Sequence, residues 1–430
     1  MPPPHFEIVR DPLWDNIRLD QTALALLDTP PMQRLRYVRQ LGHAFLVYPG
    51  ATHSRFEHAL GAYHLTRLAL AALEERGQLE GVAEKDRLAV RLAALLHDIG
   101  HYPFSHALEE AGFPSHEQLG VARLGKGELG AALQQAGGAT FHTRVGELIT
   151  GESRSPLAGL ISGSLDLDKI DYLSRDAHMC GVPYGTVDVE RLLASLAIVE
   201  TSPGRLEVGV HEKGVSALES LLFAKYQMYR NVYWHHAVRS ATCMFKRAVR
   251  VAVARGVFSA EDVGAATDDG FMERLERDGD IPLAHLVRAR RLYKRALELP
   301  ASDVPAEVQP WVSDDADLLA SVEDAVARDA GLAPSELLID YPTRENMLSV
   351  NLPLLTRDGR VDRLTDEGRA GTLGLPAVAD ELYQSARRLR VFTARPPTRE
   401  LRGLLDVLCR PPAELRKTLE WGEPVLAARG

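Results

Sequence analysis

The stretch Ala93-Ala94-Leu95-Leu96-His97-Asp98-Ile99-Gly100-His101 predicts where the fold has its centre. Almost every residue in the turns before His97 is apolar, and a helix that is apolar all round is normally buried. His97 and Asp98 would then lie in the interior, where an unpaired carboxylate is very costly unless a cation receives it. The pair therefore points to a metal site. The alternative for an isolated His-Asp dipeptide is a packed histidine beside a capping aspartate.

Two further segments supply ligand types that fit the same ion. His58 lies near the start of a helix predicted over residues 55–75, and Asp168 lies in a helix predicted over 165–178. Two imidazoles and two carboxylates suit Fe, Mn, Zn or Mg rather than a thiolate-loving ion. Four such ligands leave positions for water and substrate, as catalysis requires. The alternative for His58 is a hydrogen-bonded core histidine.

The order H…HD…D, with dense motifs around it, resembles the HD-domain metal-dependent phosphohydrolases. The resemblance extends to deoxynucleoside triphosphate triphosphohydrolases, both the animal enzyme that carries a SAM domain before its HD domain and the bacterial dNTPases without one. The motifs that carry it lie at residues 11–12, 27–30, 33–36, 40–42, 55–58, 97–101, 103–106, 116–117 and 168–172, with a weaker match over 225–235. The resemblance, which covers roughly residues 7–250, implies an HD-domain helical core. The strand-like runs after residue 335 predict a smaller α+β C-terminal lobe, so we expect a mainly α fold.

The same resemblance implies hydrolysis of dNTPs to deoxynucleoside and inorganic triphosphate at this divalent metal, with a second Mg on the substrate phosphates. His101, His106 and His116, with Glu117 beside the last, are implied as catalytic residues, one of them the general acid for the leaving 5′-oxygen; His106 could equally cap a turn. Arg55, Lys169 and Lys225 would hold phosphates, and Tyr172 would pack beneath the sugar. Asp176 would bond the 3′-hydroxyl, and the remaining substrate contacts would be Gln40, Leu41, Tyr229 and Tyr233.

Three residues match a guanine-nucleotide site that lies between subunits in the family: Asp28, Gln33 and Arg36. They imply an activating nucleotide and a homo-oligomer, either a dimer or a tetramer. The chain departs from the animal enzyme at Glu7, where that enzyme has a lysine for the phosphates. The alternative is a solvated helix face.

Composition limits the class of protein. The 430 residues are 45% hydrophobic and 25% charged, which is ordinary for a soluble globular protein. The net charge of −9 argues against a surface that coats nucleic acid, although the aromatic and basic segment 225–236 could bind a single strand. Three cysteines without CxxC spacing suggest a reducing compartment. Neither a signal peptide nor a membrane span is evident, so we expect a cytoplasmic protein.

The predicted domains are an HD phosphohydrolase domain over 1–254, a helical extension over 255–335 and an α+β lobe over 336–430. Within them we expect an extended segment over 5–20, a hairpin over 205–210 and one long helix over 215–252. Strands are expected at 336–341, 347–352 and 388–393, with a hairpin turn at Asp358-Gly359.

Two other functions fit the residues. One is an HD phosphohydrolase for nucleoside monophosphates, cyclic nucleotides or alarmones. The other is a nucleotide-sensing or single-strand-binding protein with weak catalysis.

Overall fold

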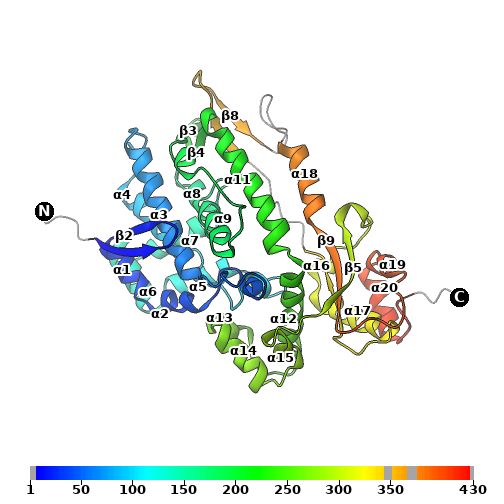
Figure 1. Ribbon diagram of the computed structural model, residues 1–430. Coiled ribbons are helices and arrows are strands. Elements are labelled where there is room, and N and C mark those ends of the chain that lie inside the picture. The colour runs from blue at the N-terminus through cyan, green and yellow to red at the C-terminus, as the bar shows by residue number, and fades with distance from the viewer. Residues whose placement is uncertain (1–5, 343–350, 366–374, 427–430) are drawn as a thin grey trace.

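The computed structural model describes residues 6–342, 351–365 and 375–426. Helices α3, α4, α7 and α9 gather on one side of the molecule in Figure 1, and the C-terminal lobe with α17, α19 and α20 lies on the other. Helices α11 and α12 run between them. The predicted fold class, a helical core with a smaller α+β C-terminal region, is confirmed.

Four helices form the core around the predicted metal site: α3 (Arg55–Glu74), α4 (Glu84–Leu96), α7 (Phe141–Ile149) and α9 (Leu167–Cys180). Helix α3 begins with a capping box, because Ser54 and Glu57 satisfy each other's free backbone amides. The Asp166 side chain caps α9 by accepting the amide of Lys169, and Gly181 ends it at a φ of 66°. The sequence thus marks the ends of both ligand-bearing helices.

Two glycines allow the ligand-bearing segments to approach one another. A Cβ on Gly61 of α3 would lie 1.8 Å from a carboxylate oxygen of Asp171 on α9. A Cβ on Gly100 would lie 1.9 Å from the carbonyl oxygen of His116. Helix α4 ends at Leu96, so His97 and His101 stand on a turn rather than on a continued helix.

The prediction of a single long helix over 215–252 is wrong. The segment forms α11 (Val215–Met228), a π-helical turn (Tyr229–Tyr233) and α12 (His236–Ala254). The side chain of His235 caps the new helix by accepting the amide of Ala237. Apolar periodicity continues across such a break, because a π turn inserts only about one extra residue.

Three small sheets accompany the helices in the described part of the chain. The N-terminal segment forms a hairpin of β1 (Glu7–Asp11) and β2 (Asp15–Leu19). The hairpin predicted over 205–210 is wrong in its bounds, because those residues form one strand, β4 (Arg205–His211), whose antiparallel partner is β3 (Leu196–Ser202). Strand β4 also pairs in parallel with β7 (Leu352–Leu355), which in turn pairs with β8 (Val361–Leu364). Gly359, at a φ of 83°, confirms the turn predicted at Asp358-Gly359.

The third sheet has the order β5-β9-β6 and belongs to the C-terminal lobe. Its strands are β5 (Lys294–Pro300), β9 (Arg388–Thr393) and β6 (Leu337–Asp340). Strands β6 and β9 confirm two predicted strands, whereas β5 lies within the segment 255–335 that was expected to be helical. Most of the strand predicted over 347–352 lies outside the described residues.

The remaining helices complete the core and the lobe. They are α1 (Gln21–Leu27), α2 (Pro30–Arg34), α5 (His116–Leu124), α6 (Gly127–Gly137), α8 (Gly159–Ser162), α10 (Val189–Leu193), α13 (Ala260–Ala265), α14 (Asp268–Arg277), α15 (Pro282–Arg288), α16 (Trp311–Asp314), α17 (Ala316–Asp329), α18 (Leu375–Ala386), α19 (Leu404–Leu408) and α20 (Pro412–Glu420), with short 3₁₀ turns that include η3 (Ser105–Ala107). Among the described residues, no helix is long and apolar enough to cross a membrane.

A buried acid in the C-terminal lobe makes stability depend on pH. Burial raises the pKa of Glu323 on α17 to about 7, against the weaker opposing effects of Arg247 and of the Ile339 amide that it accepts at 2.8 Å. The folded state therefore holds this proton more tightly than the unfolded chain does. The contribution of protonated Glu323 to the free energy of unfolding is lost as pH rises through 7. Glu323→Gln mimics the protonated form and should be about 2 kcal/mol more stable relative to the parent at pH 8 than at pH 5. Denaturant unfolding at both pH values measures this difference, and exposed Glu128→Gln should leave it near zero.

Candidate active site

The four predicted metal ligands meet at one point although they come from three segments of the chain. His58 Nε2 lies 2.7 Å from Asp168 Oδ1 and 3.2 Å from His97 Nε2. His97 Nε2 lies 3.3 Å from Asp168 Oδ1 and 3.4 Å from Asp98 Oδ1, and His58 Nε2 lies 3.7 Å from Asp98 Oδ2. The geometry thus brings all four donor groups together.

This spacing fits a divalent cation. Donors bound to one ion at about 2.1 Å stand about 3–3.4 Å from one another. Three of the four side chains, those of His58, His97 and Asp168, offer donor atoms within 4.8 Å of one another, and Asp98 lies alongside. The mixed nitrogen and oxygen set is one that Fe, Mn, Zn and Mg accept, so the donor chemistry agrees with the spacing.

His58 is fixed from behind by a buried ion network. Its Nδ1 lies 2.7 Å from Asp171 Oδ2, which leaves Nε2 facing Asp168. Asp171 also accepts hydrogen bonds from Trp14 Nε1 at 2.5 Å and from Arg175, which in turn contacts Asp11 at 2.8 Å. The Asp171–Arg175 pair expected as an i,i+4 salt bridge is present, and it also orients a candidate ligand.

Positively charged neighbours offset the negative charge of the carboxylates at the centre. Burial lowers the pKa of His58, but hydrogen bonds to Asp168 and Asp171 outweigh it and raise the pKa to about 10. Burial raises the pKa of Asp98, but Arg55 and the neighbouring histidines outweigh it and hold that pKa well below the usual range. The carboxylates are therefore ionised at neutral pH, in the state that binds a cation.

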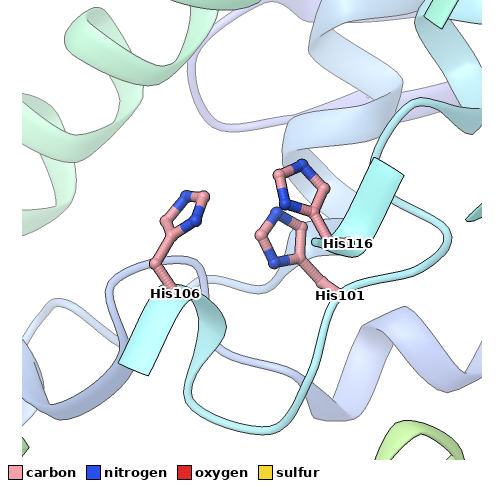
Figure 2. A group of neighbouring side chains, drawn as sticks. All are labelled: His101, His106 and His116. Atoms are coloured by element: carbon pink, nitrogen blue, oxygen red, sulfur yellow. The ribbon is translucent and has the colours of Figure 1, made fainter. Parts of the chain in front are cut away.

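Three histidines stand beside this centre on the loop after α4 and on α5. Figure 2 shows the rings of His101 and His116 lying one over the other while His106 approaches from a separate turn. The ring centroids are 3.7 Å apart for the stacked pair and 4.8 Å apart for His101 and His106. Nitrogen atoms of all three come close enough to hold a metal ion, so this group is a second place where a cation fits.

The carboxylate that orients these histidines is Glu109, which the sequence analysis missed. Its oxygens lie 2.7 Å from His106 Nδ1 and 2.6 Å from His116 Nδ1. Glu117 was expected beside His116, but it stands 3.5 Å from Nε2, and 42% of its side chain is exposed. Glu117 was expected in this role because it follows His116 in the sequence. The turn after η3 instead brings the Glu109 carboxylate to the Nδ1 atoms of His106 and His116.

A cavity of about 920 Å³ opens over the histidines and the metal centre. Such a volume accommodates a nucleotide-sized ligand. His58 is fully buried behind the wall, and Lys225 and the trio Asp28, Gln33 and Arg36 are not part of the lining. The predicted site residues that line it are Gln40, Leu41, Arg55, His97, Asp98, His101, His106, His116, Glu117, Asp168, Lys169, Tyr172, Asp176, Tyr229 and Tyr233.

Aromatic side chains form one end of the cavity. The Tyr233 hydroxyl donates to Asp176 Oδ2 at 2.7 Å, and His53 Nε2 lies 2.8 Å from the other oxygen of Asp176. The ring of Tyr233 stands 6.5 Å from that of Tyr172 and 5.0 Å from that of Tyr229, measured between centroids. This end offers flat faces for stacking and one fixed carboxylate for a hydroxyl group.

The two lining cations expected to hold phosphate already have partners. Arg55 is 4% exposed and donates to Asp98 Oδ2 at 2.6 Å and to the Ser105 hydroxyl at 3.1 Å. Lys169 pairs with Asp166 and donates to the carbonyl oxygen of Gly163 at 3.1 Å. Either cation would have to share its donors to bind a phosphate.

The three residues matched to a guanine-nucleotide site lie away from this cavity, at the surface. Arg36 Nε donates to Gln33 Oε1 at 2.9 Å, and its guanidinium stacks 3.6 Å from the centroid of the Phe56 ring. Gln33 donates to the carbonyl oxygen of Leu27, and Asp28 is exposed. Their role is untested by this arrangement and stays a prediction.

Comparison with known proteins identifies the class. Residues 55–176 match the HD domain, and residues 187–369 match the HD associated region. An uncharacterized protein of Methanocaldococcus jannaschii is 33% identical over 405 residues, covering 93% of this chain and 81% of its own length. The chain belongs to the HD-domain family, whose members are metal-dependent phosphohydrolases.

Two further proteins are similar to this chain. The deoxynucleoside triphosphate triphosphohydrolase SAMHD1 of Homo sapiens is 29% identical over 263 residues, which cover 53% of this chain and 42% of the human enzyme. The matched part is therefore less than half of that enzyme. A hypothetical protein from Aquifex aeolicus, known from a crystal structure, aligns with a TM-score of 0.70 and 25% identity over 98% of this chain and all of its own.

We expect the metal to depend on the four converging side chains. His58→Ala or Asp168→Ala should reduce bound divalent metal by at least about tenfold, because each removes a donor from a site with few others. Elemental analysis of the purified protein measures the loss. His178→Ala, an exposed position on the same helix as Asp168, is the control and should keep the parent content. Full metal content in both ligand variants would contradict the assignment.

Proposed function

We propose that this protein hydrolyses deoxynucleoside triphosphates to deoxynucleoside and inorganic triphosphate. The observation that carries the proposal is the cavity itself, which is lined by residues of a candidate metal centre, a histidine trio and an aromatic end with a fixed carboxylate. The similarity to the human triphosphohydrolase supports the same substrate class.

The reaction requires water to attack the α-phosphorus while the bond from that phosphorus to the 5′-oxygen breaks. A divalent ion, when bound, polarises the phosphoryl oxygen and lowers the pKa of water. Arg55 and Lys169 offset negative charge on the phosphates, and Lys225 would do so from outside the cavity wall. Most of the barrier reduction in such reactions comes from positioning and electrostatics.

His106 is the best-placed proton donor for the leaving 5′-oxygen. Desolvation lowers the pKa of His106, but the hydrogen bond to Glu109 outweighs it and raises that pKa above the usual imidazole value, which favours the protonated ring. Burial and the nearby Arg55 hold the pKa of His101 well below its usual value, which keeps that ring neutral. This difference favours His106 over the neighbouring His101 as the proton donor.

An activating nucleotide at Asp28, Gln33 and Arg36, a homo-oligomer and a second Mg on the substrate phosphates belong to the same proposal and rest on the family resemblance. The exposed Arg36 stacked on Phe56 offers a donor pair for a base edge at the surface. Glu7 lies on β1, exposed, where the animal enzyme carries its lysine.

The decisive experiment is product analysis. We expect purified protein with Mn²⁺, Mg²⁺ or Fe²⁺ and each dNTP to release inorganic triphosphate and deoxynucleoside, with and without added GTP. Separation of triphosphate from pyrophosphate and orthophosphate on an anion-exchange column distinguishes the products. Pyrophosphate with a nucleoside monophosphate would contradict the reaction. Turnover only of monophosphates, cyclic nucleotides or alarmones would favour the other HD-domain activities.

Tyr172 should select deoxyribose. It shares the face of α9 that bears Asp168 and lines the cavity, so a 2′-hydroxyl would meet its ring. Tyr172→Ala should raise the rate with ATP relative to dATP by roughly tenfold, because it removes a steric and polar penalty. Competition assays with the two nucleotides measure the ratio. Tyr172→Phe keeps the ring and should keep the discrimination; an unchanged ratio in the alanine variant would remove Tyr172 from this role.

A further inference from the structure

Two adjacent glutamates on the turn after η3 bind different parts of the protein. Glu109 binds His106 and His116, as described above. Glu110 is bound from the other side by Arg239 and Lys246 of α12. One short turn therefore carries both a link to the catalytic histidines and a link to a helix beyond the HD match.

Arg239 makes a bidentate contact on each side. Its Nη1 and Nη2 donate to the two oxygens of Glu110 at 2.9 and 2.8 Å. Its Nε and Nη2 donate to Asp340, at the end of β6, at 3.1 and 2.7 Å. A planar guanidinium fixes both the distance and the angle of such partners, which a lysine cannot do.

The charges continue into the sheet of the C-terminal lobe. Asp340 is 2% exposed, and Arg390 of β9 lies 3.8 Å from it. Arg390 also donates to Glu298 of β5 at 3.2 Å. Alternating charges thus connect all three strands of the β5-β9-β6 sheet to Glu110.

Local backbone bonds shape the turn itself. The amides of Glu110, Ala111 and Gly112 donate to residues only three or four positions earlier. Such short-range bonds shape a turn but do not fix where it stands relative to the rest of the protein. Leu108 adds apolar packing, because it is buried in the same cluster as Phe245 of α12, and the ion pairs of Glu110 supply the directional, charged constraint.

We propose that Arg239 is a positioning residue, through which the C-terminal lobe sets the placement of His106 and His116 by holding Glu110 and, with it, Glu109. Its kinetic test rests on the proposed function. Arg239 and Lys246 also line the cavity, so the competing role is direct binding of a substrate phosphate. The two roles differ in kinetics, because a lost phosphate contact raises KM, whereas misplaced histidines lower kcat.

The variants are Glu110→Gln, Arg239→Lys and Asp340→Asn. We expect Glu110→Gln to lower kcat by about tenfold or more, with KM and metal content near the parent values. Arg239→Lys keeps the charge but loses the planar fork of donors, so its kcat should lie between those of the parent and of Glu110→Gln. Asp340→Asn should lower kcat as well, and combining it with Glu110→Gln should add little, since both act through Arg239.

The matched control is Asp324→Asn. Asp324 on α17 pairs with Arg247, which lies two turns further along α12 and also donates to Ser335 at 3.0 Å. This pair joins the same helix to the same lobe without touching the turn, so its loss should leave kcat unchanged. An equal loss of kcat in Asp324→Asn, or unchanged kcat in Glu110→Gln, would overturn the proposal. A rise in KM alone would assign phosphate binding instead.

Hydrogen exchange separates this proposal from the proposed function. Glu110→Gln should speed amide exchange across residues 107–116 while peptides of α3 and α9 keep the parent rates. If the parent protein releases no triphosphate, the proposed function fails, and the exchange result still tests the link. If the parent is active but neither exchange nor kcat changes in Glu110→Gln, the positioning role is rejected. Thermal unfolding of each variant checks that the fold is kept.

Discussion

The structure depends on the interior contact between His58 and two carboxylates. His58 has no exposed surface, and its two ring nitrogens each lie 2.7 Å from an oxygen, one of Asp171 and one of Asp168. Ionised groups in such surroundings are tolerated only when each is paired and hydrogen-bonded. Helices α3 and α9 must therefore keep one register relative to each other, and Gly61 provides the room for it. Helix α4 delivers His97 and Asp98 to the same point.

The network behind His58 makes the N-terminal hairpin part of the centre. Asp11 on β1 holds Arg175, which holds Asp171, and Trp14 in the hairpin turn reaches the same carboxylate. All of these groups except Trp14 are nearly or fully buried, so removing one partner leaves another charge unpaired. The position of His58 and the packing of the N-terminal hairpin against α9 are thus energetically coupled.

The convergence of the four candidate ligands could be predicted because the order H…HD…D and the motifs around it resemble those of the HD-domain phosphohydrolases. An apolar helix that ends in His97-Asp98 points to a buried charged site, and His58 and Asp168 lie on helices whose ends are marked by capping residues. The role of Glu109 could not be predicted, because the path of the turn after η3 decides which histidines it contacts. The π turn at 229–233 could not be predicted, because one inserted residue barely changes the helical periodicity of the apolar positions. The parallel pairing of β4 with β7 joins residues about 140 positions apart, and no local pattern encodes such a contact.

The C-terminal lobe is a wall of the site rather than an appendage. Val312, Ser313 and Asp314 of α16 line the cavity, as do Ile339 and Tyr341 from the end of β6. An HD core alone would leave that side open to water, and charge interactions weaken where water enters. The alternating ion pairs from Glu298 to Glu110 cross the same boundary. Enclosure of the cavity and placement of the histidine-bearing turn therefore depend on the same contact surface, so a change that loosens the lobe affects both.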